Sequence, residues 1–301
     1  PMYHLRMRFR FSLLPDSGPV LGAGYLILWL LLDATAQPYW MLPYGLRFAA
    51  LLLVPMRYWG WLLGAALVAT AGMDQIHGLP PDWGGLAKNV LPGFLAMMAC
   101  MWLLRRLHVY PRLHSPQEVT RLLLSMVMVV TATTAVEVGL PMLTHAPGSP
   151  ELMFRMVAEE VLSRYLSILL VAPVLIMVWQ SRLERPALLR LLMDGVLVLV
   201  PSMAILLVLS ERTASQPQFA RVLSLAPVLF FAFRHGWRGA SLAMLITSLG
   251  MTFVDLHLGH APSPAAAYLF LAVAGTGALM LGSATDALRR SSERVAEPSM
   301  R

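Results

Sequence analysis

The stretch Phe48-Ala-Ala-Leu-Leu-Leu-Val-Pro-Met-Arg57-Tyr-Trp-Gly60-Trp joins two apolar segments through a short turn with one arginine and one glycine. Such segments predict membrane helices, and the arginine places the turn on the cytoplasmic side, where Arg and Lys are retained. A similar pattern recurs at Leu225-Ala-Pro-Val-Leu-Phe-Phe-Ala-Phe-Arg234-His-Gly236-Trp-Arg. Either the chain contains a parallel internal repeat, or each tight cytoplasmic hairpin needs its own arginine and glycine.

The composition of the whole chain is that of an integral membrane protein. Of its 301 residues, 57% are apolar and only 13% are charged, and the mean hydropathy is +0.65. Average soluble domains are about one quarter charged, so most soluble classes are excluded. We expect an all-α, polytopic transmembrane bundle of ten helices, or of eight if the short second and eighth runs do not cross. The runs are 18–36, 42–55, 59–74, 86–104, 119–143, 153–179, 189–210, 219–233, 237–257 and 265–283.

The net charge of +7 is spread along the chain in short clusters between the apolar runs. With ten crossings and a cytoplasmic N-terminus, most arginines fall in cytoplasmic loops, so both termini are expected in the cytoplasm. The charge is therefore an orientation signal, and we expect the lipid bilayer, not a nucleic acid, as the partner. The single cysteine, Cys100, excludes an internal disulfide and a cysteine metal cluster.

The chain divides into three expected parts. Residues 1–17 form a cytoplasmic N-terminal segment, 18–283 the transmembrane domain, and 284–301 an exit helix towards a missing output domain, because the sequence reads as part of a longer product. An apolar stripe with spacings of three and four leaves the membrane here and predicts either a short coiled coil or an ordinary amphipathic helix end. The residues predicted to relay a signal are Leu281, Ala284, Leu288 and Val295.

A series of short motifs along nearly the whole chain resembles the bacterial membrane-associated sensor domains of the MASE class, first-described type. The motifs are Trp40-Met-Leu-Pro43-Tyr-Gly45, Arg57 with Trp59 and Gly64-Ala65, Leu103-Leu104-Arg105-Arg106, Leu170-Val-Ala-Pro173-Val-Leu, and Phe231-Ala232-Phe-Arg234-His-Gly236-Trp-Arg238-Gly239-Ala240. The sequence departs from the family at Ser163-Arg164 and Ser167, where a Gly-Asp pair and a later Gly are usual. That reversed charge puts any shared ligand chemistry in doubt.

The resemblance implies an input module of the bacterial inner membrane. Such modules are normally followed by a histidine kinase, a diguanylate cyclase or a cyclic-di-GMP phosphodiesterase, so it implies a role in two-component or cyclic-di-GMP signalling. It also implies a homodimer through the full-length protein. The signal, a small molecule or a partner membrane protein, is not identified by the sequence.

Ionisable side chains inside apolar helices need a partner or a water-filled cavity. Under the ten-helix topology, most of them fall in the outer half of the membrane. One reading is a set of internal salt bridges that hold helices together. The other is a ligand pocket in which Arg164 or Arg47 binds an anion, or Glu137 and Glu159 bind a cation. The predicted pocket residues are Arg47, Glu137, Arg155, Glu159, Glu160 and Arg164.

Other site types receive weaker support. Asp255, His257 and His260 approach metal-ligand spacing, with His77 or His145 as a further ligand, but surface histidines explain the same pattern. We expect no cofactor and no catalysis by this segment, because no catalytic motif stands out. The alternative function is a ten-helix secondary transporter of small metabolites, which predicts polar groups at the membrane midplane and usually inverted repeats.

Overall fold

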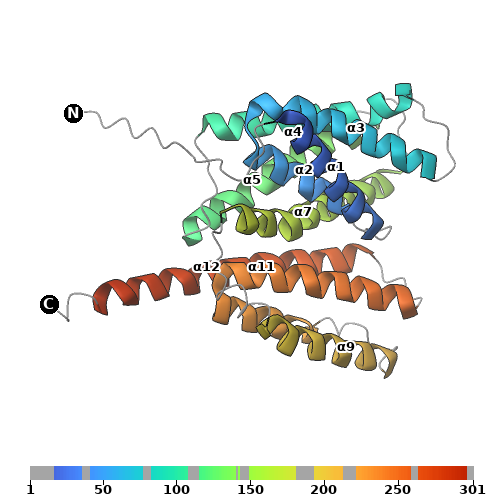
Figure 1. Ribbon diagram of the computed structural model, residues 1–301. Coiled ribbons are helices and arrows are strands. Elements are labelled where there is room, and N and C mark those ends of the chain that lie inside the picture. The colour runs from blue at the N-terminus through green and yellow to red at the C-terminus, as the bar shows by residue number, and fades with distance from the viewer. Residues whose placement is uncertain are drawn as a thin grey trace, which may run out of the picture.

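The computed structural model describes residues 17–35, 41–76, 83–107, 115–139, 142, 149–180, 193–212, 222–258 and 264–296. Within these ranges it contains nine α-helices, which confirms the predicted all-helical bundle (Figure 1). The α-helices are α1 (Gly18–Thr35), α2 (Leu42–Leu53), α3 (Trp59–Ile76), α4 (Trp83–Arg106), α5 (Pro116–Thr134), α7 (Pro150–Gln180), α9 (Val200–Arg212), α11 (Leu225–Leu258) and α12 (Pro264–Ala296). Three short elements are η1 (Met56–Tyr58) and the π-helical η2 (Ala135–Gly139) and η3 (Gly195–Leu199).

Helix α7 lies at the centre of the arrangement. It packs against α2 and α5 on one side and against α11 and α12 on the other (Figure 1). The approach to α2 is close, because a Cβ added at Gly45 would overlap the backbone oxygen of Ser167. Its middle is apolar and almost fully buried, as Leu166, Ile168 and Leu169 show. A movement of α7 would therefore displace its neighbours on both sides, α2 and α5 as well as α11 and α12.

The two hairpins found in the sequence have the same capping device. The Arg105 guanidinium at the end of α4 donates to the carbonyl oxygens of Leu51 and Val54, at 2.8 and 2.6 Å, where α2 ends. The Arg289 guanidinium donates to the carbonyl oxygens of Phe233 and Arg234, at 2.7 and 2.9 Å, just before the bend in α11. The last carbonyls of a helix lack partners within it. Each hairpin thus receives an arginine from the helix that follows, which favours the internal repeat.

The bend in α11 requires glycine. Gly236 has φ 65° and ψ −152°, a left-handed conformation that separates the two helices predicted as 219–233 and 237–257. A Cβ at this position would also overlap the Asp286 carboxylate of α12. The Asp286 Oδ2 atom instead accepts a hydrogen bond of 3.3 Å from the backbone N–H of Trp237, a donor in the first turn after the bend.

Three described segments are long and apolar enough to cross a membrane: Pro116–Gly139, Pro150–Trp179 and Tyr268–Ser292. Shorter apolar helices cover Gly18–Ala34, Leu42–Leu53 and Gly195–Ile205. Large apolar side chains also remain on the surface, among them Phe154 and Leu197, with exposed fractions of 77% and 74%. Apolar surface on this scale fits a lipid environment. The count of ten crossings stays a prediction.

The last membrane helix and the predicted exit helix are one element. Helix α12 runs without a break from Pro264 to Ala296, past the end predicted at residue 283. The stripe leaves the bundle along it: Leu281 and Ala284 are half-buried, and Leu288 is 69% exposed. The side chain of Val295 lies outside the described set. Any displacement of α12 inside the bundle is therefore carried directly to its exposed end.

Candidate functional site

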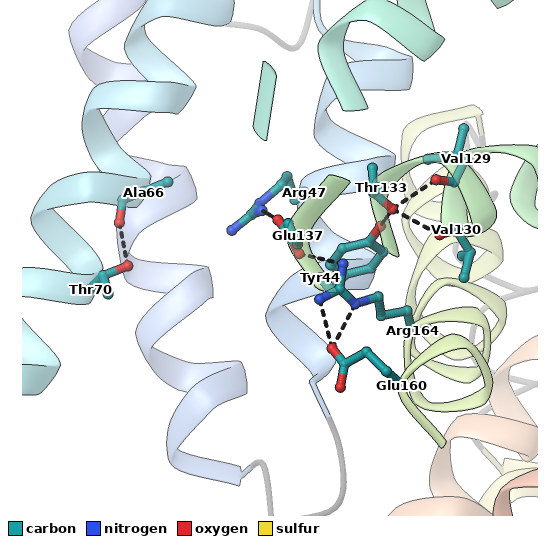
Figure 2. A network of polar contacts seen from close by, with 10 residues as sticks. All are labelled: Tyr44, Arg47, Ala66, Thr70, Val129, Val130, Thr133, Glu137, Glu160 and Arg164. Atoms are coloured by element: carbon teal, nitrogen blue, oxygen red, sulfur yellow. Dashed lines mark hydrogen bonds and ion pairs between the residues drawn. The ribbon is translucent and has the colours of Figure 1, made fainter. Parts of the chain in front are cut away.

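A group of four charged residues around the buried Arg164, here called the charge cluster, joins three elements of the structure (Figure 2). Arg47 comes from α2, Glu137 from η2, and Glu160 and Arg164 from α7. The Arg164 side chain, only 6% exposed, pairs through Nη1 with Oε2 of Glu137. Its Nε and Nη2 atoms both lie 2.7 Å from Oε1 of Glu160. Arg164 thus joins the α7 acid to the η2 acid.

Local geometry explains why these groups meet. Glu160 and Arg164 are four residues apart on α7, so their side chains lie on one helix face, with the acid before the base as predicted. Glu137 is carried by the π-helical turn that follows α5. Insertions of this kind often occur at functional sites. The η2 turn brings the carboxylate to Arg164, a placement that sequence spacing does not predict.

Replacement of Gly93 by alanine is expected to break up the charge cluster. The Cβ of the new side chain would overlap Oε1 and Cδ of Glu137, because α4 passes directly beside that carboxylate. Forcing extra atoms into a packed interior typically costs about 1–3 kcal/mol. Thermal unfolding of the purified chain in lipid nanodiscs checks this. Gly72→Ala on α3 is the control, since no heavy atom lies within 4 Å of its added Cβ; equal loss in both variants would contradict the placement of Glu137.

Aromatic and hydroxyl groups that the sequence reasoning missed complete the cluster. The Tyr44 hydroxyl is hydrogen-bonded to Thr133 Oγ1, and Thr133 in turn donates to the Val129 carbonyl at 2.8 Å (Figure 2). The Arg164 guanidinium lies over the Tyr44 ring, 5.1 Å from its centroid. Tyr44 stands one turn before Arg47 on α2, a spacing that brings both to one face. The sequence pointed to Tyr44 only through that spacing and through its place in the Trp40–Gly45 motif.

Arg47 is the least neutralised member of the cluster. Its Nη1 atom lies 3.9 Å from Oε1 of Glu137, beyond hydrogen-bond distance, and its side chain is 13% exposed. The guanidinium lies near two aromatic rings, 5.1 Å from the centroid of Phe94 and 5.9 Å from that of Tyr44. Cation–π contacts of this type contribute roughly 0.5–2 kcal/mol. They stabilise a cation without supplying a counter-charge.

The structure separates two of the six predicted pocket residues from the others. Arg155 and Glu159 form an ion pair of 3.0 Å, but the Arg155 side chain is 68% exposed. Each is the ion-pair partner of the other, and an exposed pair contributes little to stability. The described contacts therefore bring together Arg47, Glu137, Glu160 and Arg164, and leave Arg155 and Glu159 as a surface pair.

Polar contacts connect α7 to α12 and then α12 to the bend in α11. Tyr165, the residue after Arg164, is hydrogen-bonded through its hydroxyl to Thr276 Oγ1 of α12 at 2.9 Å. Nearer the exit, Thr285 Oγ1 donates to the Ala232 carbonyl at 3.1 Å. Together with the Asp286 and Arg289 contacts, it forms what we call the exit clamp: Thr285, Asp286 and Arg289. Sequence reasoning did not predict these contacts.

A second ionic group supports the bend from the other side. Asp194, just before η3, accepts from Arg234 Nε and lies equally near His235 Nε2, both at 2.8 Å. The Arg234 side chain is 54% exposed, so its pair with Asp194 is partly screened by solvent. The residues around the bend are thus held from both η3 and α12.

The predicted metal site stays a prediction. His260, His77 and His145 lie outside the described residues, as do the side chains of Asp255 and His257. Among the described residues, no group of three His, Cys, Asp or Glu side chains is placed to hold a metal ion. The charge cluster is accordingly the candidate site that the structure describes.

Comparison with known proteins supports the resemblance seen in the sequence. The MASE1 family model matches residues 18–286, which include the charge cluster and two of the three exit-clamp residues, Thr285 and Asp286. No curated protein and no solved structure matches the chain. The match covers most of the 301 residues, so the chain belongs to the MASE1 family of membrane-associated sensory domains.

Proposed function

We propose that this chain is the integral-membrane input domain of a bacterial signal-transduction protein. It detects a signal at the outer face or within the membrane and relays it to a cytoplasmic histidine kinase or cyclic-di-GMP output domain. MASE1 domains are sensory and not themselves catalytic, which supports the first half of this proposal. The observation that carries it is that neighbouring residues on α7 join the charge cluster to the exit helix.

The relay begins at α7. Arg164 holds the cluster acids, while Tyr165 holds Thr276 on α12. A signal that alters the pairing of Arg164 would shift or rotate α7 and, with it, the Tyr165 hydroxyl. Because a packed interior does not deform continuously, small shifts tend to move whole helices between discrete positions. The α7–α12 contact is therefore the step that converts a change of charge into a movement of α12.

The relay ends at the exit clamp and the exposed end of α12. The clamp sets where α12 lies relative to the bend in α11, and beyond it the helix carries the stripe Leu281, Ala284, Leu288 and Val295. In a homodimer these residues would pack against their copies in the partner subunit. A change in clamp geometry would then rotate or displace the two exit helices relative to each other.

The membrane placement follows from the charge distribution. We propose a multi-pass protein of the bacterial inner membrane with both termini in the cytoplasm, since that orientation leaves most arginines inside. The charge cluster then lies towards the outer side and the clamp towards the inner side. The transporter alternative loses support, because the two arginine-capped hairpins share the same order along the chain, whereas transporters usually show inverted repeats.

The α7–α12 contact provides the test. In the full-length polypeptide, reconstituted in vesicles, Thr276→Val is expected to change the output activity about twofold to tenfold, because one buried neutral hydrogen bond contributes about 0.5–1.5 kcal/mol. The matched control is Thr70→Val, since the described hydrogen bond of Thr70 stays within its own helix, to the Ala66 carbonyl at 2.9 Å. An unchanged output in both variants, or the absence of any output domain in the reading frame after Arg301, would refute the proposed function.

A further inference from the structure

We infer that the Arg47 end of the charge cluster binds an anionic oxygen group, a carboxylate or a phosphate. That this group is the signal rests on the proposed function; that it binds rests on the geometry alone. The sequence leaves an anionic and a cationic ligand equally open. The described contacts distinguish the two.

The ion pairs leave one cation without an adequate counter-ion. Arg164 forms ion pairs both with Glu160 and with the Oε2 atom of Glu137. Arg47 is left with Oε1 of Glu137 at 3.9 Å. The cluster is neutral in formal charge, but the pairing within it is uneven. Both acids are engaged by Arg164, so a cationic ligand would have to compete with it, whereas an anion at Arg47 meets no such competition.

Unpaired hydrogen-bond donors converge at the same place. The Nε atom of Arg47 is buried and has no acceptor among the residues that the structure describes. The Tyr25 side chain of α1 is 5% exposed and lies beside Arg47, close enough for its hydroxyl oxygen to face the guanidinium as an acceptor. Its hydroxyl hydrogen also finds no acceptor. A guanidinium has donors only, so Arg47 cannot accept this hydrogen. Within the described part of the chain, the Arg47 Nε–H and the Tyr25 hydroxyl hydrogen are thus two neighbouring donors that one added oxygen group could satisfy.

A third donor lies on the same face of α1. Trp29 stands four residues after Tyr25 and is 8% exposed, and its buried Nε1 has no acceptor in the described ranges. A buried donor without a partner costs about 1–3 kcal/mol, so several such donors close together are rare in folded proteins and indicate a ligand site. An oxyanion with several lone pairs would satisfy Arg47 and Tyr25 together.

The aromatic rings favour the same ligand class. The rings of Phe94 and Tyr44 lie near the guanidinium and restrict how it can turn. A guanidinium held in this way presents a planar pair of donors, the geometry that carboxylate and phosphate oxygens accept best. Arg47 is also 13% exposed, so it is not sealed from an incoming ligand.

Thermal unfolding of the purified chain in phosphatidylcholine nanodiscs tests the site. Acetate and inorganic phosphate, each titrated to millimolar concentration, represent a free anion, and nanodiscs that contain phosphatidylglycerol represent a lipid headgroup. We expect at least one of these probes to raise the unfolding temperature. Arg47→Gln should weaken the apparent affinity on the order of tenfold to a hundredfold, the loss expected for a charge-assisted hydrogen bond.

Two further variants keep the test decisive. Tyr25→Phe removes only the hydroxyl and should weaken binding several-fold, even if Arg47→Gln does not fold. Arg106→Gln is the control, because Arg106 is exposed and also rests on an aromatic ring, 4.7 Å from the Trp102 centroid. The Arg106→Gln variant should bind each probe with the same apparent affinity as the unaltered chain. No shift with any probe, or an equal shift in Arg47→Gln, would overturn the anion site; if Thr276→Val still changes output, the proposed function would stand without it.

Discussion

Arg164→Gln is expected to destabilise the folded chain by about 3 kcal/mol. Removal of one partner from a buried ion pair costs about 3–5 kcal/mol, because the other charge stays buried and unpaired. Here Glu137 and Glu160 would both be left, with side chains 15% and 24% exposed. That partial exposure places the loss at the lower end of the range.

Unfolding of the variant in lipid nanodiscs, followed by circular dichroism, measures this loss. Arg155→Gln is a matched control, because Arg155 and Glu159 form a pair with the same spacing of four residues on the same helix. Its side chain is 68% exposed, so its loss should be below about 1 kcal/mol. Addition of Glu137→Gln and Glu160→Gln to Arg164→Gln should restore much of the stability. Equal losses at Arg164 and Arg155 would contradict the buried cluster.

Arg289→Gln is expected to change the output activity of the full-length protein on the order of tenfold. The substitution removes the donors to the Phe233 and Arg234 carbonyls, and hydrogen bonds from charged groups contribute about 1.5–3 kcal/mol each when buried. Arg289 is exposed, so each of its hydrogen bonds is expected to contribute less than that. Release of the clamp frees α12 from the bend in α11, and the exit helix then loses its fixed position.

The internal repeat supplies the control for this prediction. Arg105→Gln removes the same type of cap from the other hairpin, where the guanidinium donates to the Leu51, Leu52 and Val54 carbonyls. Because Arg105 lies on α4 and not on the exit helix, the variant should lose stability but keep its output level once folded. Autophosphorylation or cyclase activity, normalised to the amount of folded protein, distinguishes a change of output from a loss of stability. A similar change of output in both variants would show that the clamp on α12 has no special role.

The sequence predicted the elements of this fold better than their contacts. Apolar runs placed most of the helices, since burial in lipid and in the bundle both select apolar side chains, but they did not predict that α12 continues to Ala296. The spacing of Glu160 and Arg164 predicted their ion pair, which depends only on helix geometry. The same spacing predicted the Arg155 and Glu159 pair, but it gave no sign that this pair lies on the surface.

Spacing rules predict contacts within one helix, but not contacts between helices that are distant in the sequence. Glu137 reaches Arg164 because α5 continues into the π-helical η2, and no sequence signal announced that insertion. Likewise, the arginines expected at the hairpin turns were Arg57 and Arg234, whereas the caps come from Arg105 and Arg289, which follow a whole helix later. Tertiary packing alone brings those guanidinium groups to the carbonyl ends they cap.

The most direct measurement is the distance between spin labels at Leu107 and Ser292, two exposed positions at the ends of α4 and α12. Both residues are replaced by cysteine in a Cys100→Ala background, which removes the only native thiol. Pulsed electron resonance in nanodiscs then compares this protein with the same protein carrying Glu137→Gln. If the charge cluster controls the exit helix, the substitution shifts the mean distance or adds a second population. Superimposable distance distributions in two folded proteins would contradict that control.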